Sequence, residues 1–252
     1  MLTKFLKISL LLVLTSNNVF AAGDAEPLIK RIWQFEGVKG SIDKRSAQRG
    51  FQVYKEVCAS CHSLKRVYFR NLAEIGFNEA EIKSLAATYQ ITDGPDESGD
   101  MYERAGRASD KFPMPYPNEN AARAANGGAY PPDLSLIVKA RPDGANYLYS
   151  LLNGYRNPPE SLNLGDGMYY NIYYPGKQIA MPSPLSDGLV EYADNTNATI
   201  DQMSVDLVNF LQWTAEPEME ARNRMGIKVI LFLIAFTILL YIAKKRIWSD
   251  VE

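Results

Sequence analysis

The sequence contains few of the residues that build most metal and disulfide sites. Its 252 residues include only two cysteines and one histidine. Two cysteines cannot form a disulfide-rich scaffold, and a lone histidine excludes most zinc sites and any catalytic set that needs a second histidine. The chain also lacks an excess of basic charge, since 27 lysines and arginines stand against 29 acids. We therefore expect no nucleic-acid partner.

Long apolar runs are confined to the two ends of the chain, and the mean hydropathy of −0.21 excludes a polytopic membrane protein. The N-terminus combines two early lysines, a mainly apolar run from Ile8 to Leu14, and the small residues Ala21 and Ala22. This order is typical of a secretory signal peptide, which we predict for residues 1–21. The alternative is a short membrane helix, but the apolar run is too short to span a bilayer.

The second apolar run extends over residues 226–243 and is followed directly by two lysines and an arginine. A helix of this length covers roughly 27 Å, close to the hydrocarbon thickness of a bilayer. We predict a transmembrane anchor over residues 226–243 and an exported domain over residues 22–220. By the positive-inside rule, residues 244–252 form a cytoplasmic tail. A buried core helix is the alternative, but a soluble helix need not be apolar on every face.

The exported domain has a mainly helical pattern with many loops. Apolar residues recur at helical spacing from Ser46 to Cys61, and a second helix is expected near Glu79 to Tyr89. A third helix is expected to open at Thr199, where the residue pattern fits a helix cap. Residues 111–184 hold most of the prolines and many glycines, so we expect long ordered loops there. The predicted fold class is mainly α.

Charge is distributed unevenly along this domain. Residues 74–110 carry nine acids against three bases, and residues 186–206 carry five acids and no base. Solvated surface is the simpler interpretation of each run. The functional alternative is an acidic face that attracts a basic soluble partner and raises the rate of encounter.

The residues with the clearest chemistry are Cys58-Ala59-Ser60-Cys61-His62, the C-x-x-C-H pattern of c-type haem attachment. Positions three and four apart share a helix face. Both sulfur atoms can therefore add to the two vinyl groups on one porphyrin edge, while His62 reaches the iron. We predict one covalent haem c per chain, bound through Cys58 and Cys61 with His62 as a metal ligand.

Three other interpretations of the motif are less favourable. A thioredoxin-like redox pair uses C-x-x-C at a helix start after a strand, whereas a helical pattern precedes Cys58. A zinc site finds no further cysteine or histidine in the chain. A plain disulfide between Cys58 and Cys61 closes a very short loop and stabilises little.

The iron needs a sixth ligand, and no second histidine exists to provide it. Methionine is the usual partner and raises the reduction potential. Met181 is a candidate because prolines on both sides restrict its backbone, and a stiff loop loses less entropy on binding. Met114, between Pro113 and Pro115, is the rival candidate on the residues alone. The alternative for Met181 is ordinary core packing.

These motifs belong to a wider set of segments that closely resemble the cytochrome c1 family and cover nearly the whole chain after the predicted signal peptide. The segments are Cys58–Ser63, Pro115–Glu119, Ala121–Ala129, Pro131–Ser135, Tyr147–Leu152, Gly154–Tyr155, Tyr173–Gly176, Ala215–Glu218 and Arg224–Gly226. The resemblance implies that Cys58 and Cys61 hold the haem and that His62 and Met181 are its axial ligands. It also implies that Arg123 lies near a haem propionate, although Arg123 can equally be read as a surface arginine on an alanine-rich helix.

The family resemblance further implies a function and partners. Such a chain is the electron-transfer subunit of a quinol–cytochrome c oxidoreductase, the cytochrome bc1 complex, and is not an enzyme on its own. The implied partners are cytochrome b, a Rieske iron–sulfur protein that donates one electron, soluble cytochrome c that accepts it, and the lipid bilayer. We expect a single-pass protein of the bacterial inner membrane with a periplasmic haem domain, or of the mitochondrial inner membrane with an intermembrane-space domain.

Rival functions remain open at this point. One is a separate membrane-anchored c-type cytochrome that donates to a terminal oxidase. Others are a haem-sensing or assembly module without turnover, and a thiol–disulfide oxidoreductase that uses Cys58 and Cys61.

Overall fold

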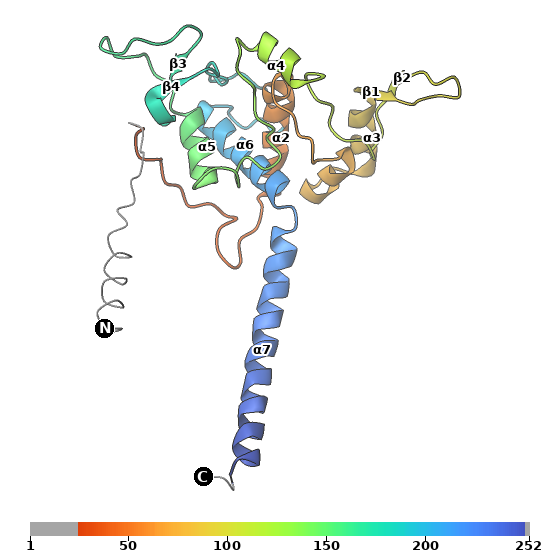
Figure 1. The fold of residues 1–252 in the computed structure, drawn as a ribbon, viewed down its shortest axis with the longest axis vertical. Helices are drawn as coiled ribbons and strands as arrows, with labels where there is room; N and C mark the ends of the chain where they lie inside the picture. Colours follow the sequence, from red (N-terminus) through yellow and green to blue (C-terminus); the bar gives the residue numbers. More distant parts are fainter. Residues whose placement is uncertain (1–24, 250–252) are drawn as a thin grey trace, which may run out of the picture.

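The computed structural model describes residues 25–249, and it consists of a helical domain from which one long helix projects (Figure 1). The predicted signal peptide, residues 1–21, lies outside the described residues. Within the described part, strands are limited to two short antiparallel pairs. The predicted mainly α fold class with long connecting segments is confirmed.

The centre of the domain is the packing of helix α2 (Lys44–Glu56) against helix α6 (Ile200–Ala215). Asp43 caps α2 through the N–H groups of residues 45 and 46, and Thr199 caps α6, as predicted, through the N–H of Gln202. Gly50 permits the close crossing, because a Cβ atom there would lie 2.0 Å from the carbonyl oxygen of Asp206. Any larger residue at position 50 would force the two helices apart.

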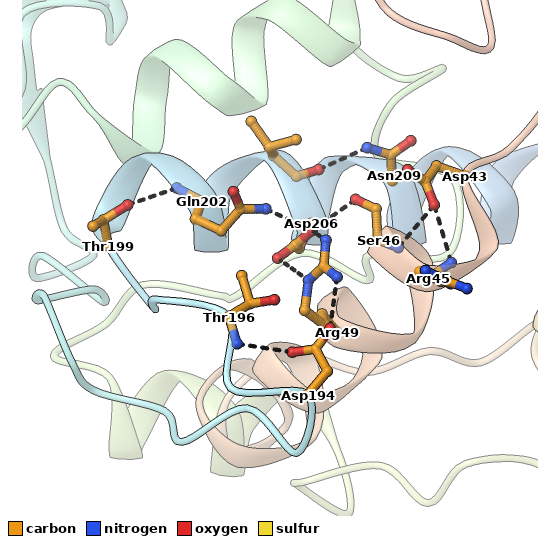
Figure 2. Close-up of polar contacts among 11 residues, drawn as sticks. Asp43, Arg45, Ser46, Arg49, Asp194, Thr196, Thr199, Gln202, Asp206 and Asn209 are labelled. Atoms are coloured by element: carbon orange, nitrogen blue, oxygen red, sulfur yellow. Dashed lines mark hydrogen bonds and ion pairs between the residues drawn. The ribbon is translucent and has the colours of Figure 1, made fainter.

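A buried polar network joins the same two helices (Figure 2). The guanidinium of Arg49 binds both carboxylate oxygens of Asp206, each at 2.9 Å, and also binds Asp194 at 2.9 Å. The Asp206 side chain is completely buried and also accepts from Ser46 Oγ at 2.7 Å and Gln202 Nε2 at 3.1 Å. Arg49 thereby ties α2 to α6 and to the segment that precedes α6. The acidic stretch of residues 186–206 is therefore not simply an exposed face, because Asp206 is buried in this network.

Aromatic side chains fill the space between α2, α6 and the segment after the C-x-x-C-H motif. Phe51 and Tyr54 of α2 lie 5.6 and 5.7 Å from Phe210 of α6, measured between ring centroids. Phe112 lies 4.3 Å from Phe69 and contacts both α2 rings at 5.8 to 6.4 Å. The tilted and edge-to-face arrangements are those that aromatic pairs prefer.

Shorter elements surround this core. On one side lie the 3₁₀-helix η2, helix α3 and the β1–β2 hairpin, in which Gln90 pairs with Ala105. On the other lie α5, the 3₁₀-helix η3 and the β3–β4 pair, in which Tyr169 pairs with Ile179, and α4 lies above α2 between the two groups (Figure 1). Their bounds are η2 Phe69–Ile75, α3 Glu79–Ala87, β1 Gln90–Asp93, β2 Tyr102–Ala105, α4 Glu119–Ala125, α5 Gly144–Leu152, β3 Tyr169–Tyr170, η3 Pro175–Lys177 and β4 Gln178–Ile179.

Two sequence expectations need correction. The helix predicted from Ser46 to Cys61 ends earlier, because α2 stops at Glu56 and a separate 3₁₀ turn η1 (Cys58–Ser60) follows. Residues 111–184 are not loops throughout, since α4 and α5 lie within them. Helix α5 is short, and its apolar residues pack against α6, which gives it stability that a nine-residue helix lacks in isolation.

Helix α7 (Met219–Ile247) is long and apolar enough to cross a membrane. Its 29 residues extend for about 43 Å at 1.5 Å per residue. The best 18-residue window has a mean hydropathy of 2.5, and none of that window is buried against the rest of the chain. The predicted C-terminal apolar helix, long enough to span a membrane, is confirmed, and the helix itself extends beyond residues 226–243 at both ends.

Candidate functional site

The Cys58-Ala59-Ser60-Cys61-His62 motif lies on a tight turn directly after α2. The N–H groups of Cys61 and His62 both donate to the carbonyl oxygen of Cys58, at 3.1 and 2.8 Å. Both cysteines are free thiols and both are half-buried. The turn therefore holds two sulfur atoms and one imidazole close together without a disulfide between them.

His62 is oriented by a backbone carbonyl from a distant part of the chain. Its Nδ1 atom lies 2.8 Å from the carbonyl oxygen of Pro132. A carbonyl can only accept, so Nδ1 carries the proton and Nε2 keeps its lone pair. Burial lowers the pKa of His62, although the Pro132 hydrogen bond and the charge of Asp133 oppose this shift. The neutral imidazole with Nε2 available is the form that binds a metal.

Asp133 holds in place the segment whose Pro132 carbonyl binds His62. Its carboxylate accepts hydrogen bonds from Ser63 Oγ at 2.8 Å, from the N–H of Lys65 at 2.9 Å and from the N–H of Ser135 at 3.0 Å. Burial raises the pKa of Asp133, but these hydrogen bonds outweigh burial and the pKa is lowered. The carboxylate thus stays ionised and fastens the segment to the residues that follow His62. This supporting role was missed by our sequence analysis.

The environment of the Cys58 thiol argues against a thiol–disulfide oxidoreductase. Burial, with a smaller contribution from Cys61, raises the pKa of the Cys58 thiol to about 12. Reactive C-x-x-C cysteines instead have a lowered pKa, because the thiolate is the attacking species. A helix also precedes Cys58, where the redox motif needs a strand.

An open pocket of about 170 Å³ lies beside Cys61. Its walls include Tyr116, Ala122 and Pro131, and the Tyr116 hydroxyl lies 3.8 Å from the Cys61 sulfur. Met114 also lines this pocket, with half of its surface exposed to solvent. Met114, the rival candidate for the sixth iron ligand, therefore lies near Cys61.

Met181 lies in a segment that is anchored on both sides. Ile179 of β4 and Leu185 are buried, and the Tyr155 hydroxyl donates to the Met181 carbonyl at 3.0 Å. Met181 itself is half-buried. The segment is thus held against the chain that follows α5, as the flanking prolines led us to expect of a stiff loop. Tyr155 was not recognised from the sequence as a contact of this segment.

Arg123 lies on α4, close to the pocket beside Cys61. Its guanidinium binds Glu119 Oε1 at 2.7 and 2.9 Å and donates to the Gly128 carbonyl at 2.9 Å. It also lies 5.6 Å from the ring centre of Tyr130. Glu119 and Tyr130 both line the pocket, so Arg123 is a neighbour of the motif. Its side chain is about half exposed, at 47%.

The residues at this site fit a covalently attached haem. No disulfide joins Cys58 and Cys61, so each sulfur can form a thioether, and the imidazole offers Nε2 to an iron. Among residues 25–249, His62 is the only histidine, so a second protein ligand must be of another type. The structure brings Cys58, Cys61 and His62 together on one turn. Arg123 lies on α4 beside the Cys61 pocket, and Met181 lies in the segment after β4, which Tyr155 holds.

Comparisons with known proteins agree with this assignment. A family model described as "Cytochrome C1 family" matches residues 33–251. The chain is 48% identical over 241 residues to "Cytochrome c1" of Rhodospirillum rubrum, with 89% of each chain covered. It is 51% identical over 218 residues to "Cytochrome c1-2, heme protein, mitochondrial" of Solanum tuberosum, covering 86% of this chain and 84% of that one.

A third relative is longer. "Cytochrome b/c1" of Bradyrhizobium diazoefficiens is 50% identical over 240 residues, which cover 86% of this chain but only 35% of that protein. The chain therefore spans about a third of the length of that relative.

Proposed function

The chain belongs to the cytochrome c1 family and carries haem c, and we propose that it transfers single electrons from a Rieske iron–sulfur protein to soluble cytochrome c. In this role it is the electron-carrying subunit of a cytochrome bc1 complex beside cytochrome b, and it is not an enzyme on its own. The observation that supports the proposal most strongly is the His62 Nδ1–Pro132 hydrogen bond, which leaves Nε2 available beside two free thiols.

Haem c, when bound, supplies a one-electron iron couple. Cys58 and Cys61 would hold it, because each S–H bond can add across one vinyl group to form a thioether. His62 would bind the iron through Nε2, and Pro132 and Asp133 fix the direction of the imidazole ring. The protein moves no proton and breaks no substrate bond at this site; its residues set the geometry and the polarity around the iron.

Met181 is the proposed second axial ligand. The Tyr155 hydrogen bond to its carbonyl and the burial of Ile179 and Leu185 support this choice, since they fix its backbone. Met114 is less suitable because half of its surface is exposed to solvent. A thioether held by a stiff segment loses little entropy when it binds.

Arg123 is proposed to lie near a haem propionate. It is a neighbour of the pocket beside Cys61 through Glu119 and Tyr130, and its charge would form a charge-assisted hydrogen bond with a carboxylate. The exposure of its side chain means that this bond would be partly screened by water.

The docking face for a basic soluble partner is proposed to be the acidic part of residues 74–110. The tip of the β1–β2 hairpin carries Asp96, Glu97 and Asp100, all exposed. These three side chains have no ion pair among the described residues, whereas Asp93 and Asp110 pair with Arg104. Unpaired exposed acids attract a basic partner over a distance of about one Debye length.

Orientation in the membrane completes the proposal. The last turn of α7 carries Lys244, Lys245 and Arg246, which are proposed to stay on the cytoplasmic or matrix side. The haem domain, residues 22–220, then lies in the periplasm or the intermembrane space, and the proposed signal peptide explains its export.

Affinity purification of the tagged chain from its own membranes tests the assignment to a bc1 complex. We expect cytochrome b and a Rieske protein to co-purify in equal amounts with the chain, and quinol to reduce its haem. Recovery with terminal oxidase subunits instead would favour the alternative, a separate membrane-anchored cytochrome that donates to an oxidase.

A further inference from the structure

A second open pocket lies at the end of the domain from which α7 leaves, and its lining includes no residue of the C-x-x-C-H motif. It has a volume of about 350 Å³. The first residues of α7, the last residues of α6, the start of α5 and the turn around Gly37 form its walls. A volume of this size lies in the range of small-molecule sites.

The pocket opens near the membrane surface. Arg222 and Asn223 line it, and they precede Ile227, near the start of the apolar run, by five and four residues. At about 1.5 Å per residue they lie roughly 6 to 8 Å outside the apolar run. The polar interface of a bilayer is about 5 to 7 Å thick on each side. The pocket is therefore at the depth of phospholipid head groups, and the exposed apolar residues of α7 begin at Met225, two residues after Asn223.

The cationic side of the pocket is Arg222. Its Nη1 atom lies 3.0 Å from Glu216, and its side chain is 57% exposed. Glu216 is already engaged by Lys139 at 2.7 Å and by Gln212 at 3.0 Å. Burial raises the pKa of Glu216, but Lys139 and Arg222 outweigh burial and the pKa is lowered. Glu216 contacts one nitrogen of Arg222, so the remaining guanidinium N–H groups are left for a ligand. Within residues 25–249, the Asn223 amide beside it donates only to the Gly37 carbonyl, at 3.5 Å.

The anionic side of the pocket is Glu36. Among the described residues, its carboxylate has only one long contact, from the N–H of Trp33 at 3.5 Å. Asp143, also in the wall, is already paired with Lys30. Apolar surface from Phe35, Val138 and Met219 completes the lining. The pocket thus combines one available cation, one available carboxylate and an apolar wall.

We propose that this pocket binds the head group of a zwitterionic phospholipid with a primary amine, with the phosphate on Arg222 and Asn223 and the ammonium on Glu36. Phosphatidylglycerol has the same phosphate but would place only neutral hydroxyls beside Glu36, and these bind a carboxylate more weakly than an ammonium does. A quaternary amine has no N–H to donate to the carboxylate. The chemistry of the lining therefore favours the phosphatidylethanolamine class over phosphatidylglycerol and phosphatidylcholine.

Native mass spectrometry of the full haem-loaded chain tests the proposal. The detergent-purified chain is offered phosphatidylethanolamine, phosphatidylcholine or phosphatidylglycerol at equal concentration, and the retained lipid is measured. We expect phosphatidylethanolamine to be retained best, and Arg222→Gln to weaken its binding about tenfold or more, as expected for the loss of a charge-assisted hydrogen bond. Glu36→Gln is expected to abolish the preference over phosphatidylcholine.

Arg224→Gln is the matched control, because Arg224 lies two residues further along α7 and outside the pocket lining. Its lipid binding should equal that of the unmodified chain. Asn223→Ala provides a second test that breaks no ion pair, and it should also weaken binding. The haem spectrum and melting temperature of each variant report separately on the haem site and on folding.

Four results would overturn the proposal, and the first three concern lipid binding. They are equal retention of the three lipids, unchanged binding in both Arg222→Gln and Asn223→Ala, and equal losses in Arg222→Gln and Arg224→Gln. A fourth is a cross-link from position 222 to a protein subunit, with no lipid retained, in the complex isolated from membranes. That outcome would assign the pocket to a protein interface.

Discussion

Replacing Arg49 with methionine is expected to destabilise the haem domain strongly. The substitution keeps most of the side-chain length but removes the three 2.9 Å contacts that Arg49 makes with Asp206 and Asp194. Asp206 is completely buried, so its carboxylate would keep only Ser46 and Gln202 as hydrogen-bond donors. Removing one partner of a buried ion pair typically costs about 3–5 kcal/mol.

The expected loss in the free energy of unfolding corresponds to a measurable fall in melting temperature. For a domain of this size, 1 kcal/mol corresponds to about 2–4 °C, so Arg49→Met should melt roughly 6–20 °C below the unmodified chain. Far-UV circular dichroism of the full haem-loaded chain in detergent provides the melting curve. Arg45→Met is the control, because Arg45 is an exposed neighbour on α2 that takes part in the network only through its backbone N–H (Figure 2).

A double variant separates the lost ion pair from general damage to packing. Arg49→Met combined with Asp206→Leu removes both charges, and it should be more stable than Arg49→Met alone because no unpaired charge remains buried. The reasoning would be refuted if Arg49→Met melted at the same temperature as Arg45→Met. It would also be refuted if the double variant lost the sum of the two single losses.

Further expected outcomes concern the haem, the partner and acid stability. Met181→Leu should lower the reduction potential and let carbon monoxide bind the reduced iron, whereas Met114→Leu should change neither; the reverse pattern would assign the ligand to Met114. Electron transfer to cytochrome c should slow as salt rises, and a rate indifferent to ionic strength would remove the acidic residues 74–110 as a docking face. The pKa of Asp110 is lowered to about 2 by its hydrogen bonds with Arg104, and that of Asp194 to about 2 by its hydrogen bonds with Thr196 and Arg49. Because these values lie below the unfolded value of about 3.9, the stability they contribute is present above about pH 4 and is lost as the pH falls towards 2. Melting curves recorded in that pH range should show this loss of stability, and Asp110→Asn should make the melting temperature fall less steeply with pH. An equally steep fall in Asp110→Asn and in the unmodified chain would contradict the role given to Asp110.

The parts of the fold that local pattern determines were predictable from the sequence. The spacing of Cys58, Cys61 and His62, the start of α6 at Thr199 and the apolar α7 all depend on residues close together in the chain. The end of α2 at Glu56 was not predictable in the same way. No proline or glycine stands between Glu56 and Cys61, yet α2 ends at Glu56 and a 3₁₀ turn follows. The motif that comes next is held by a contact from His62 to the Pro132 carbonyl, 70 residues away.

Contacts between residues far apart in the chain also explain why the sequence did not show which charged residues are buried and paired. Asp206 belongs to an acidic run that suggests exposed surface, but Arg49 lies 157 residues earlier and buries it. The role of Asp133 could not be recognised from the sequence, because its donors Ser63 and Lys65 lie 70 and 68 residues earlier in the chain. Such partners become apparent only once the chain is folded, because a charge pattern does not specify which residues meet.

The most direct test of the account is the mass and colour of the mature chain. If Cys58 and Cys61 hold haem through thioethers, the intact protein should exceed its peptide mass by one haem and show a c-type α-band that survives acid–acetone extraction. Replacing both cysteines with serine should remove the covalent addition. A colourless mature chain whose mass equals that of the bare peptide, with thiols that alkylate after reduction, would contradict the account.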